Sequence, residues 1–366
     1  MHIFANKSSL LEGISTVQKA VPSKTTLPIL EGLLLEAGGG KLKITGTDLE
    51  IGIETLVNVD VVEPGRVVVS SKIFGEIIRK MPDADVEIYL KDSNVLNIKC
   101  EGSSFKLIGI NSDDFPELPK IIKENAINIT QKNLKEMIRH TIFSVATEDL
   151  RPIITGMLFE IADGKATMVA LDGFRMAVKW DEIKSSINNK VVIPGKTMSE
   201  ISKILEDSED MVNIFFSKNQ ALFQIEDTVI TTRLLEGEFI NYKQIIPSAY
   251  KINVVTENHK LIDACERAAL FARDSNSNMI KFEISDDKMI IRSNSQNGDV
   301  KEELNIFKEG EDLEIAFNAK YFIDALKVID TEKIKIEFIN NVSPCILKPF
   351  EKEGYLYLVL PSRFKK

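Results

Sequence analysis

The chain has 366 residues, 44% hydrophobic and 28% charged, which is the composition of a water-soluble globular protein of two or three domains. No window approaches the roughly 18 consecutive apolar residues of a membrane span, and the opening MHIFANKSSLLEG lacks the basic region and apolar run of a secretion signal, so we expect a cytoplasmic protein with no membrane contact. A formal net charge of −9 argues against general attraction to nucleic acid.

The cysteines are too few and too far apart to form a disulfide framework. They number three, at Cys100, Cys265 and Cys345. We expect them to be small buried side chains in a reducing compartment.

The predicted elements of the first third form one unit. A helix is predicted over 6–21, with an Asn or Ser near its start as a cap. Two alternating apolar runs over 30–54, joined by the turn AGGGK, predict a β-hairpin whose glycines supply positive φ. A β-branched strand at 67–69 leads into a second helix over 70–81, and paired strands follow over 86–100.

The chain repeats this unit twice. The segment VVVSSKIFGEIIRKM at 67–81 recurs 124 residues later as VVIPGKTMSEISKIL, and 124 residues after that as IAFNAKYFIDALKVI. Each copy has apolar residues at spacings of three and four, which predicts an amphipathic helix with a preserved charged face. The charged positions are Lys72, Lys196 and Lys320, then Glu76, Glu200 and Asp324, then Arg79, Lys203 and Lys327.

The repeat predicts three similar α+β domains. Further helices at 131–146 and 258–273, each followed by hairpin patterns, complete the second and third copies. The period is far above that of solenoid repeats, so each copy can hold its own core. Prolines interrupt the pattern in DFPELPKIIKEN and NYKQIIPSAYK, which predicts domains over 1–120, 121–247 and 248–366.

Motifs of catalysis are weak in this sequence. The stretch PGKT at 194–197 resembles the end of a phosphate-binding loop, but such a loop needs a glycine five residues before Gly195, where Lys190 stands. A phosphate-transfer enzyme using Gly195, Lys196 and Thr197 is therefore a minor hypothesis. The three histidines are not paired at metal-ligand spacing. We predict no catalytic residue, no metal site and no cofactor.

The charges are distributed unevenly. The six predicted helical segments, taken as 6–21, 70–81, 131–146, 195–205, 258–273 and 319–329, hold 15 basic and 7 acidic residues, whereas the rest of the chain holds 31 basic and 48 acidic ones. One explanation is only that helices favour lysine. The other combines the charges with the repeat: equivalent helices placed around an axis would bring their basic faces onto one inner surface.

Repeated domains joined head to tail either close into a ring or grow into a filament. A ring with a basic helical inner wall and acidic sheets outside would suit a polyanion that passes through it, because phosphate contacts without base contacts permit sliding. The alternative is a non-catalytic structural protein whose β-rich repeats assemble into a filament or shell.

Four motifs together resemble a known family. They are TLPILEGLLLE in the first copy, LDGFRMAV in the second, RAALFARDSNS in the third and the terminal LVLPSRF. The whole chain is similar to the bacterial DNA polymerase III beta subunits, the replicative sliding clamps. The resemblance implies a ring-shaped head-to-tail homodimer around duplex DNA, with helices lining the hole and antiparallel sheets outside. It implies a non-catalytic processivity factor of the DNA polymerase III holoenzyme.

The resemblance also implies partners and site residues. The partners would be duplex DNA, a second copy of the chain, the clamp loader, replicative and repair polymerases, ligase and mismatch-repair proteins, the enzymes binding through short peptides with apolar anchors. The subunit interface would include Lys72, Leu107, Leu270 and Phe271. Residues in contact with DNA would include Lys24 and the loop Glu148, Asp149, Leu150, Arg151, Pro152 and Ile153, beside the basic positions Lys72, Arg79, Lys196, Lys203, Lys320 and Lys327 of the repeated helices.

The peptide pocket implied by the resemblance lies between the second and third domains and uses the C-terminal strand. The segment LYLVLP supports this physically, because a proline ends an apolar strand beside Arg363 and leaves a hydrophobic rim. By position, the pocket residues would be Ile154, Leu171, Gly173, Phe174, Arg175, Met176, Ile240, Gln244, Ile245, Leu358, Val359, Leu360, Pro361, Ser362 and Arg363.

Overall fold

The computed structural model describes residues 1–366 except 92–93, 148–150, 275–277 and 364–366. Packing divides the chain into two compact units, which are Met1–Lys132 with Ser199–Leu234, and Asn133–Met198 with Leu235–Lys366. The division runs through α3 (Gln131–Arg139) and α4 (Gly195–Ser202). Each unit is an α+β structure built on antiparallel sheets, as the sequence predicts.

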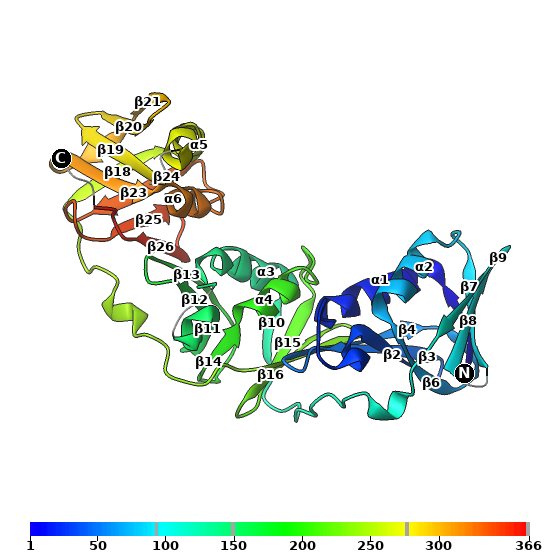
Figure 1. Cartoon of the computed structure of the whole chain (residues 1–366). Helices are drawn as coiled ribbons and strands as arrows, with labels where there is room; N and C mark the ends of the chain where they lie inside the picture. The colour runs from blue at the N-terminus through cyan, green and yellow to red at the C-terminus, as the bar shows by residue number, and fades with distance from the viewer. Residues whose placement is uncertain (92–93, 148–150, 275–277, 364–366) are drawn as a thin grey trace. The chain divides into compact units, whose positions relative to one another are not determined.

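The first unit contains two sheets (Figure 1). Its strands are β1 (His2–Asn6), β2 (Gly32–Gly38), β3 (Lys41–Thr47), β4 (Ile51–Asn58), β5 (Asp60–Glu63), β6 (Gly65–Ser70), β7 (Asp85–Lys91), β8 (Val95–Cys100), β9 (Ser103–Ile108), β10 (Ile127–Thr130), β15 (Met211–Phe216), β16 (Gln220–Ile225) and β17 (Thr228–Arg233). The sheet orders are β5-β1-β7-β8-β9 and β10-β15-β16-β17-β4-β3-β2-β6. Because β17 pairs with β4, strands of the second repeat continue the sheet of the first.

Two helices of this unit, α1 (Lys7–Val17) and α2 (Ser71–Lys80), lie side by side on the larger sheet (Figure 1). The Asn6 side chain accepts two backbone hydrogen bonds from the first turn of α1, which confirms the predicted cap. A Cβ on Gly13 would lie 2.6 Å from Val57, so glycine allows α1 to approach β4 closely. The fully buried face of α1 consists of Leu10, Ile14 and Val17.

The predicted glycine turn is present between β2 and β3. Gly39 and Gly40 adopt φ angles of +59° and +76° there. Residues with a side chain rarely adopt these positive φ angles, so the turn requires glycine at these positions. The stretch GGGK is therefore explained by hairpin geometry.

The second unit also contains two sheets. Its strands are β11 (Gly156–Ala162), β12 (Lys165–Leu171), β13 (Arg175–Glu182), β14 (Asn189–Pro194), β18 (Ile252–Glu257), β19 (Met279–Ser285), β20 (Lys288–Ser295), β21 (Gly298–Asn305), β22 (Phe307–Glu309), β23 (Leu313–Asn318), β24 (Lys333–Phe338), β25 (Cys345–Pro349) and β26 (Tyr355–Val359). The sheet orders are β14-β11-β12-β13-β26-β25-β24-β18-β22 and β21-β20-β19-β23. Pairing of β13 with β26 joins the second and third repeats in one sheet.

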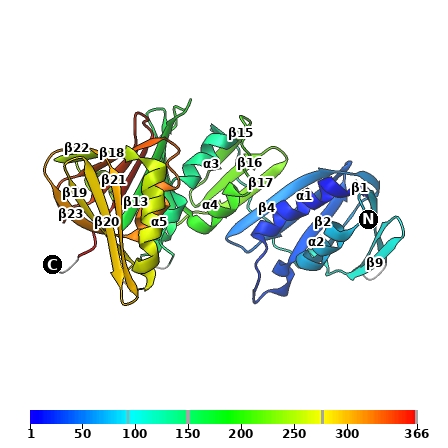
Figure 2. The same cartoon turned by 90° about the horizontal axis from the view of Figure 1, so that it is seen from above.

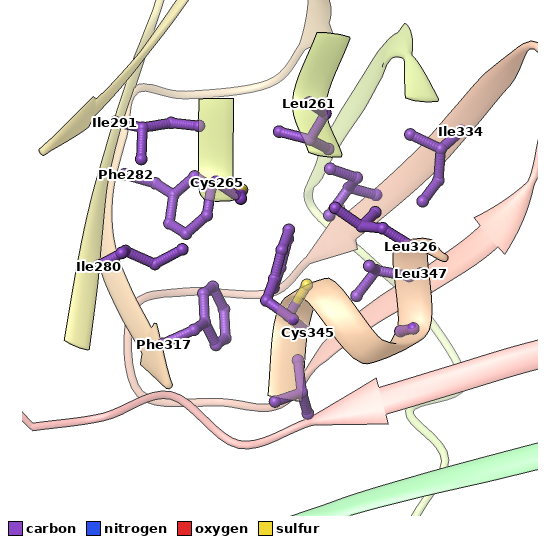
Figure 3. Close-up of a cluster of buried hydrophobic side chains, with 14 of the residues drawn as sticks. Leu261, Cys265, Ile280, Phe282, Ile291, Phe317, Leu326, Ile334, Cys345 and Leu347 are labelled. Atoms are coloured by element: carbon purple, nitrogen blue, oxygen red, sulfur yellow. The ribbon is translucent and has the colours of Figure 1, made fainter. Parts of the chain in front are cut away.

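The core of the third repeat lies beneath α5 (Asn258–Asp274) and α6 (Ala319–Leu326). Figure 2 shows α5 lying along β20 and β21. In Figure 3, Cys265 of α5 and Cys345 of β25 are two of the buried side chains of this cluster. All three cysteines are buried and free, as predicted, and burial raises the pKa of Cys265 and Cys345 so that both remain unreactive thiols.

Several predicted helices end before the expected residue, and the difference is largest for the helix predicted over 131–146. The periodic pattern predicts a helix over 131–146, but α3 ends at Arg139 and a short 3₁₀ helix follows at Ile142–Ser144. The Thr141 hydroxyl donates to the carbonyl oxygen of Met137 at 2.7 Å, and its backbone N–H bonds to Ile138 in the tighter 3₁₀ pattern. This local bonding stops the α-helix although the apolar spacing continues.

A buried histidine beside this helix end predicts a pH-dependent stability. Burial lowers the pKa of His140, and the nearby Lys179 and Arg139 lower it further, against the opposing effects of the Glu136 carbonyl and carboxylate. The unfolded chain therefore binds a proton near pH 6.5 that the folded chain does not, so stability falls as pH drops below about 6.5. The slope contributed by this one site is at most about 1.4 kcal/mol per pH unit.

We expect His140→Phe to flatten this slope in thermal unfolding measured between pH 7.5 and 5.5, because phenylalanine keeps the edge-to-face contact with Tyr355 without titrating. A control, His259→Gln on the exposed start of α5, should retain the slope. An unchanged pH dependence in His140→Phe would contradict this assignment.

Candidate functional sites

The repeated basic residues are on the surface of their helices. Lys72 and Arg79 are exposed on α2, Lys196 is exposed on α4, and Lys320 is exposed on α6. Lys203 and Lys327 follow the last turns of α4 and α6, with side chains 56% and 55% exposed. Lys72, Arg79 and Lys203 belong to the first unit, whereas Lys196, Lys320 and Lys327 belong to the second.

The repeated acidic residue holds a basic neighbour in each copy. Because the basic partners are exposed to water, such pairs contribute only about 0–1 kcal/mol each. The pairs are Arg79 with Glu76, Lys203 with Glu200 at 2.7 Å and Lys320 with Asp324 at 2.6 Å, and Lys327 pairs with Glu266 of α5 at 2.6 Å.

Two equivalent loops precede short 3₁₀ helices at Pro28–Glu31 and Pro152–Thr155. In each, a proline begins the 3₁₀ helix after an extended residue. Lys24, Arg151 and Pro152 are exposed, and Ile153 is half-buried. The predicted residues Glu148, Asp149 and Leu150 lie outside the described residues.

The predicted pocket residues come from the 3₁₀ helix Pro152–Thr155, the β12–β13 hairpin, the end of β26 with the residues after it, and the segment before β18, all in the second unit. The backbone N–H of Leu360 donates to the carbonyl oxygen of Phe174 at 2.8 Å, which joins the turn to the C-terminal strand. Phe174 and Leu360 are 60% and 39% exposed. These two residues form an apolar rim.

The rest of the predicted set divides by burial. A buried group underlies the rim and belongs to the protein core, consistent with an apolar strand that is partly core. The buried residues are Ile154, Leu171, Arg175, Met176, Leu358 and Val359; Ile240, Pro361 and Ser362 are half-buried; Gly173, Gln244, Ile245 and Arg363 are exposed.

Arg175 is held by groups that the sequence did not reveal. Its guanidinium is 7% exposed and donates to Asp172 Oδ2 at 2.9 Å, to Asp324 Oδ2 at 2.7 Å and to the carbonyl oxygen of Phe143. It also lies 4.4 Å from the centre of the Tyr321 ring. Burial lowers the pKa of Arg175, but Tyr357 and the hydrogen-bonded Asp324 and Asp172 outweigh that effect and raise it. The cation therefore stays charged.

Tyr321 extends the apolar rim. Its ring stacks against Phe174 with ring centres 6.3 Å apart, and its carbonyl oxygen accepts a hydrogen bond from the Tyr357 hydroxyl. Tyr321 and Asp324 lie one turn apart on the repeated helix α6. The sequence analysis placed Asp324 only on the repeated charged face and did not connect either residue with the pocket. The sequence offered one signal for this contact, which is Arg175 within an apolar strand. A buried arginine needs a carboxylate partner.

Apolar surface is also exposed at two sheet edges. Strand β9 ends the five-stranded sheet and β21 ends the four-stranded one. Next to β9, Ile73 and Phe105 line an open groove of about 890 Å³ beside α2 together with Lys72. Next to β21, Leu270 is 63% exposed on α5, and Phe271 is half-buried close to Gly298.

One predicted interface residue is placed differently from its neighbours. Leu107 is only 7% exposed, whereas Ile108 beside it is 80% exposed. Leu107 pairs with the fully buried Leu96 across the sheet, so its side chain belongs to the core of this unit. Phe105 and Ile108 are the exposed apolar residues of β9 that sequence reasoning missed.

The weak catalytic motifs have structural explanations. A Cβ on Gly195 would lie 2.8 Å from Val145 and 3.0 Å from the Thr155 carbonyl oxygen, so close packing accounts for the glycine of PGKT. In the described part of the chain, no three His, Cys, Asp or Glu side chains gather as a metal site. No helix among the same residues is long and apolar enough to cross a membrane.

Repeated α+β units, rows of exposed basic residues on their helices and open apolar sheet edges are together the features of a DNA-clamp protein. Models of the N-terminal, central and C-terminal domains of the DNA polymerase III beta subunit match residues 1–119, 128–241 and 243–363. The chain belongs to the DNA polymerase III beta subunit family and consists of three tandem clamp domains.

Individual relatives agree over full length. The beta sliding clamp of Halalkalibacterium halodurans is 35% identical, and the match covers 99% of this chain and 100% of that protein. The DNA polymerase sliding clamp from Bacillus subtilis has 33% identity and a TM-score of 0.96, covering 100% of both chains. A DNA polymerase III beta subunit structure from Thermotoga maritima has 30% identity and a TM-score of 0.94, also covering 100% of both.

Proposed function

We propose that this chain is a DNA sliding clamp, a non-catalytic processivity factor that encircles duplex DNA and tethers the replicative polymerase. The observation that supports this most is the same amphipathic helix in each repeat, carrying exposed basic residues, in a chain that matches sliding clamps over its full length. Retention on closed circular DNA and loss from linear DNA test the function.

In the proposed ring, two copies join head to tail, so that the open edge beside β9 of one copy meets the open edge beside β21 of the other. Strand pairing there would continue the sheets and bury Ile73, Phe105 and Leu270. Lys72 lines the same groove beside α2, which supports its proposed place at both the interface and the DNA surface.

The inner surface would bind phosphates through Lys24, Lys72, Arg79, Arg151, Lys196, Lys203, Lys320 and Lys327. These contacts carry no base specificity, so the ring can slide. The carboxylate partners of Lys203, Lys320 and Lys327 bind these exposed lysines only weakly, so phosphates could replace them.

The oligomer provides a direct test of ring closure. We expect light scattering to give a mass near 82 kDa, twice the 41.1 kDa chain, independent of concentration. Leu270→Asp should yield the 41.1 kDa monomer at micromolar concentration, because the change places a carboxylate in both interfaces of a head-to-tail dimer. A weakening of at least about a hundredfold is expected, since each carboxylate costs on the order of 2 kcal/mol.

The control Phe307→Asp alters an apolar residue of similar exposure on β22 and should remain dimeric. A mass that grows with concentration would instead support a filament. A Leu270→Asp protein that stays at the dimer mass would contradict the proposed interface.

We further propose that the rim of Phe174, Tyr321 and Leu360 receives the apolar anchors of short peptides from the clamp loader, replicative and repair polymerases, ligase and mismatch-repair proteins. The rim combines exposed apolar side chains with the half-buried Pro361 and Ser362 and the exposed Arg363, a combination typical of peptide sites. Domain boundaries near residues 120 and 247, and a location in the bacterial cytoplasm, complete the proposal.

A further inference from the structure

A single carboxylate oxygen on α6 links the two proposed binding surfaces. Asp324 Oδ2 accepts hydrogen bonds from Arg175 Nη1 at 2.7 Å and from Lys320 Nζ at 2.6 Å. The arginine is buried below the proposed peptide rim, whereas the Lys320 side chain is 69% exposed. A cation of the pocket and a cation of the proposed DNA surface therefore share one acceptor oxygen.

Arg175 determines the position of the rim. Asp172 Oδ1 accepts hydrogen bonds from the backbone N–H groups of Phe174 and Arg175. Asp172 Oδ2 accepts a hydrogen bond from Arg175 Nε, so the arginine closes the turn that carries Phe174. Its guanidinium lies on the Tyr321 ring, which in turn stacks on Phe174. Any change in the bond between Arg175 and Asp324 therefore acts on both aromatic walls.

We propose that Asp324 is a positioning residue that couples DNA contact at Lys320 to peptide affinity at the rim. When a DNA phosphate binds Lys320, the lysine releases Asp324 Oδ2, which then accepts a hydrogen bond from Arg175 only. The electrostatic repulsion between Lys320 and Arg175 is also removed. The remaining bond is charge-assisted and largely shielded from water, so it strengthens and holds the rim in its binding geometry. Peptide affinity then rises when duplex DNA is present.

The inference rests on the proposed clamp function, and linkage makes it reciprocal, so that bound peptide strengthens DNA contact by the same factor. Lys327 supplies the matched comparison. It lies seven positions after Lys320 on the same face and is similarly exposed, but it pairs with Glu266 and has no contact with Asp324 among the described ion pairs.

The test measures fluorescence anisotropy of a labelled short peptide with one Leu and one Phe anchor, bound to the full-length dimer with and without saturating linear duplex at low salt. We expect DNA to tighten peptide binding about fivefold in the unchanged protein, the lower end of typical coupling between sites. In Lys320→Met, affinity without DNA should already be raised, and DNA should add nothing. Lys327→Met should retain the full gain at saturating DNA.

Asp324→Asn should lower affinity without DNA and also abolish the gain. If this variant does not fold, Lys320→Met still decides the question, since its side chain is exposed. An equal DNA-induced gain in Lys320→Met overturns the coupling. If the peptide binds the unchanged protein equally with and without DNA, the coupling is overturned but the pocket is not. If the peptide does not bind at all, both the coupling and the proposed pocket are overturned.

Discussion

Leu360→Asp is expected to abolish stimulation of the polymerase while leaving a folded dimer. Leu360 is 39% exposed at the end of β26, and its backbone N–H, which the substitution preserves, holds the Phe174 carbonyl. An aspartate would place a carboxylate where an apolar peptide anchor is expected to be buried, at a cost of about 3 kcal/mol or more. That cost corresponds to peptide binding weakened by at least about a hundredfold.

The measurement is the length of product made per polymerase binding event on a primed circle, together with peptide anisotropy and the mass in solution. Phe307→Asp serves as the matched control, because Phe307 is an exposed apolar residue on β22, the edge strand of the same sheet. This variant should stimulate the polymerase normally. Normal product length with Leu360→Asp would refute the rim as the tethering site. A loss of dimer mass would assign the defect to assembly.

The second large effect concerns the topology of the DNA. Protein loaded on a closed circle should remain bound through gel filtration at high salt and should leave at least about tenfold faster once the circle is linearised, because phosphate contacts alone are weak and screened. The surface pairs of Lys203, Lys320 and Lys327 show that these cations already have alternative partners in the absence of DNA.

A circle cut in one strand only is the control, since it has no free duplex end and should retain the ring. Salt should shorten residence on linear DNA and have little effect on closed circles. Equal retention on linear and circular DNA would refute the ring mechanism and favour ordinary surface binding.

The tether also explains why weak peptide binding suffices. A polymerase that releases the primer end stays beside it, held through the clamp, so rebinding is governed by a high effective concentration. Affinity at the rim can then remain low enough for partners to exchange. The coupling through Asp324 would raise affinity only where the clamp is in contact with DNA, which favours recruitment to loaded rings.

Local features were predictable from the sequence. The Asn6 cap, the positive-φ glycines after β2 and the repeated helix beginning near Lys72 depend on neighbouring residues within one or two turns. The end of α3 was not predicted, because the Thr141 hydroxyl competes with the helix although the apolar spacing continues. Leu107 and Ile108 could not be distinguished as buried and exposed, since that depends on which face of an edge strand is covered.

The sequence by itself determined the threefold repeat, the type of the main elements in each copy and the amphipathic charge of each helix, because adjacent residues carry the helical and strand periodicities. Only the tertiary structure decided that β17 pairs with β4, that β13 pairs with β26, and that Arg175 meets Asp324 across 149 positions of chain. Strand pairing and buried ion pairs depend on how segments distant in the chain pack together, and the spacing of neighbouring residues does not determine that packing.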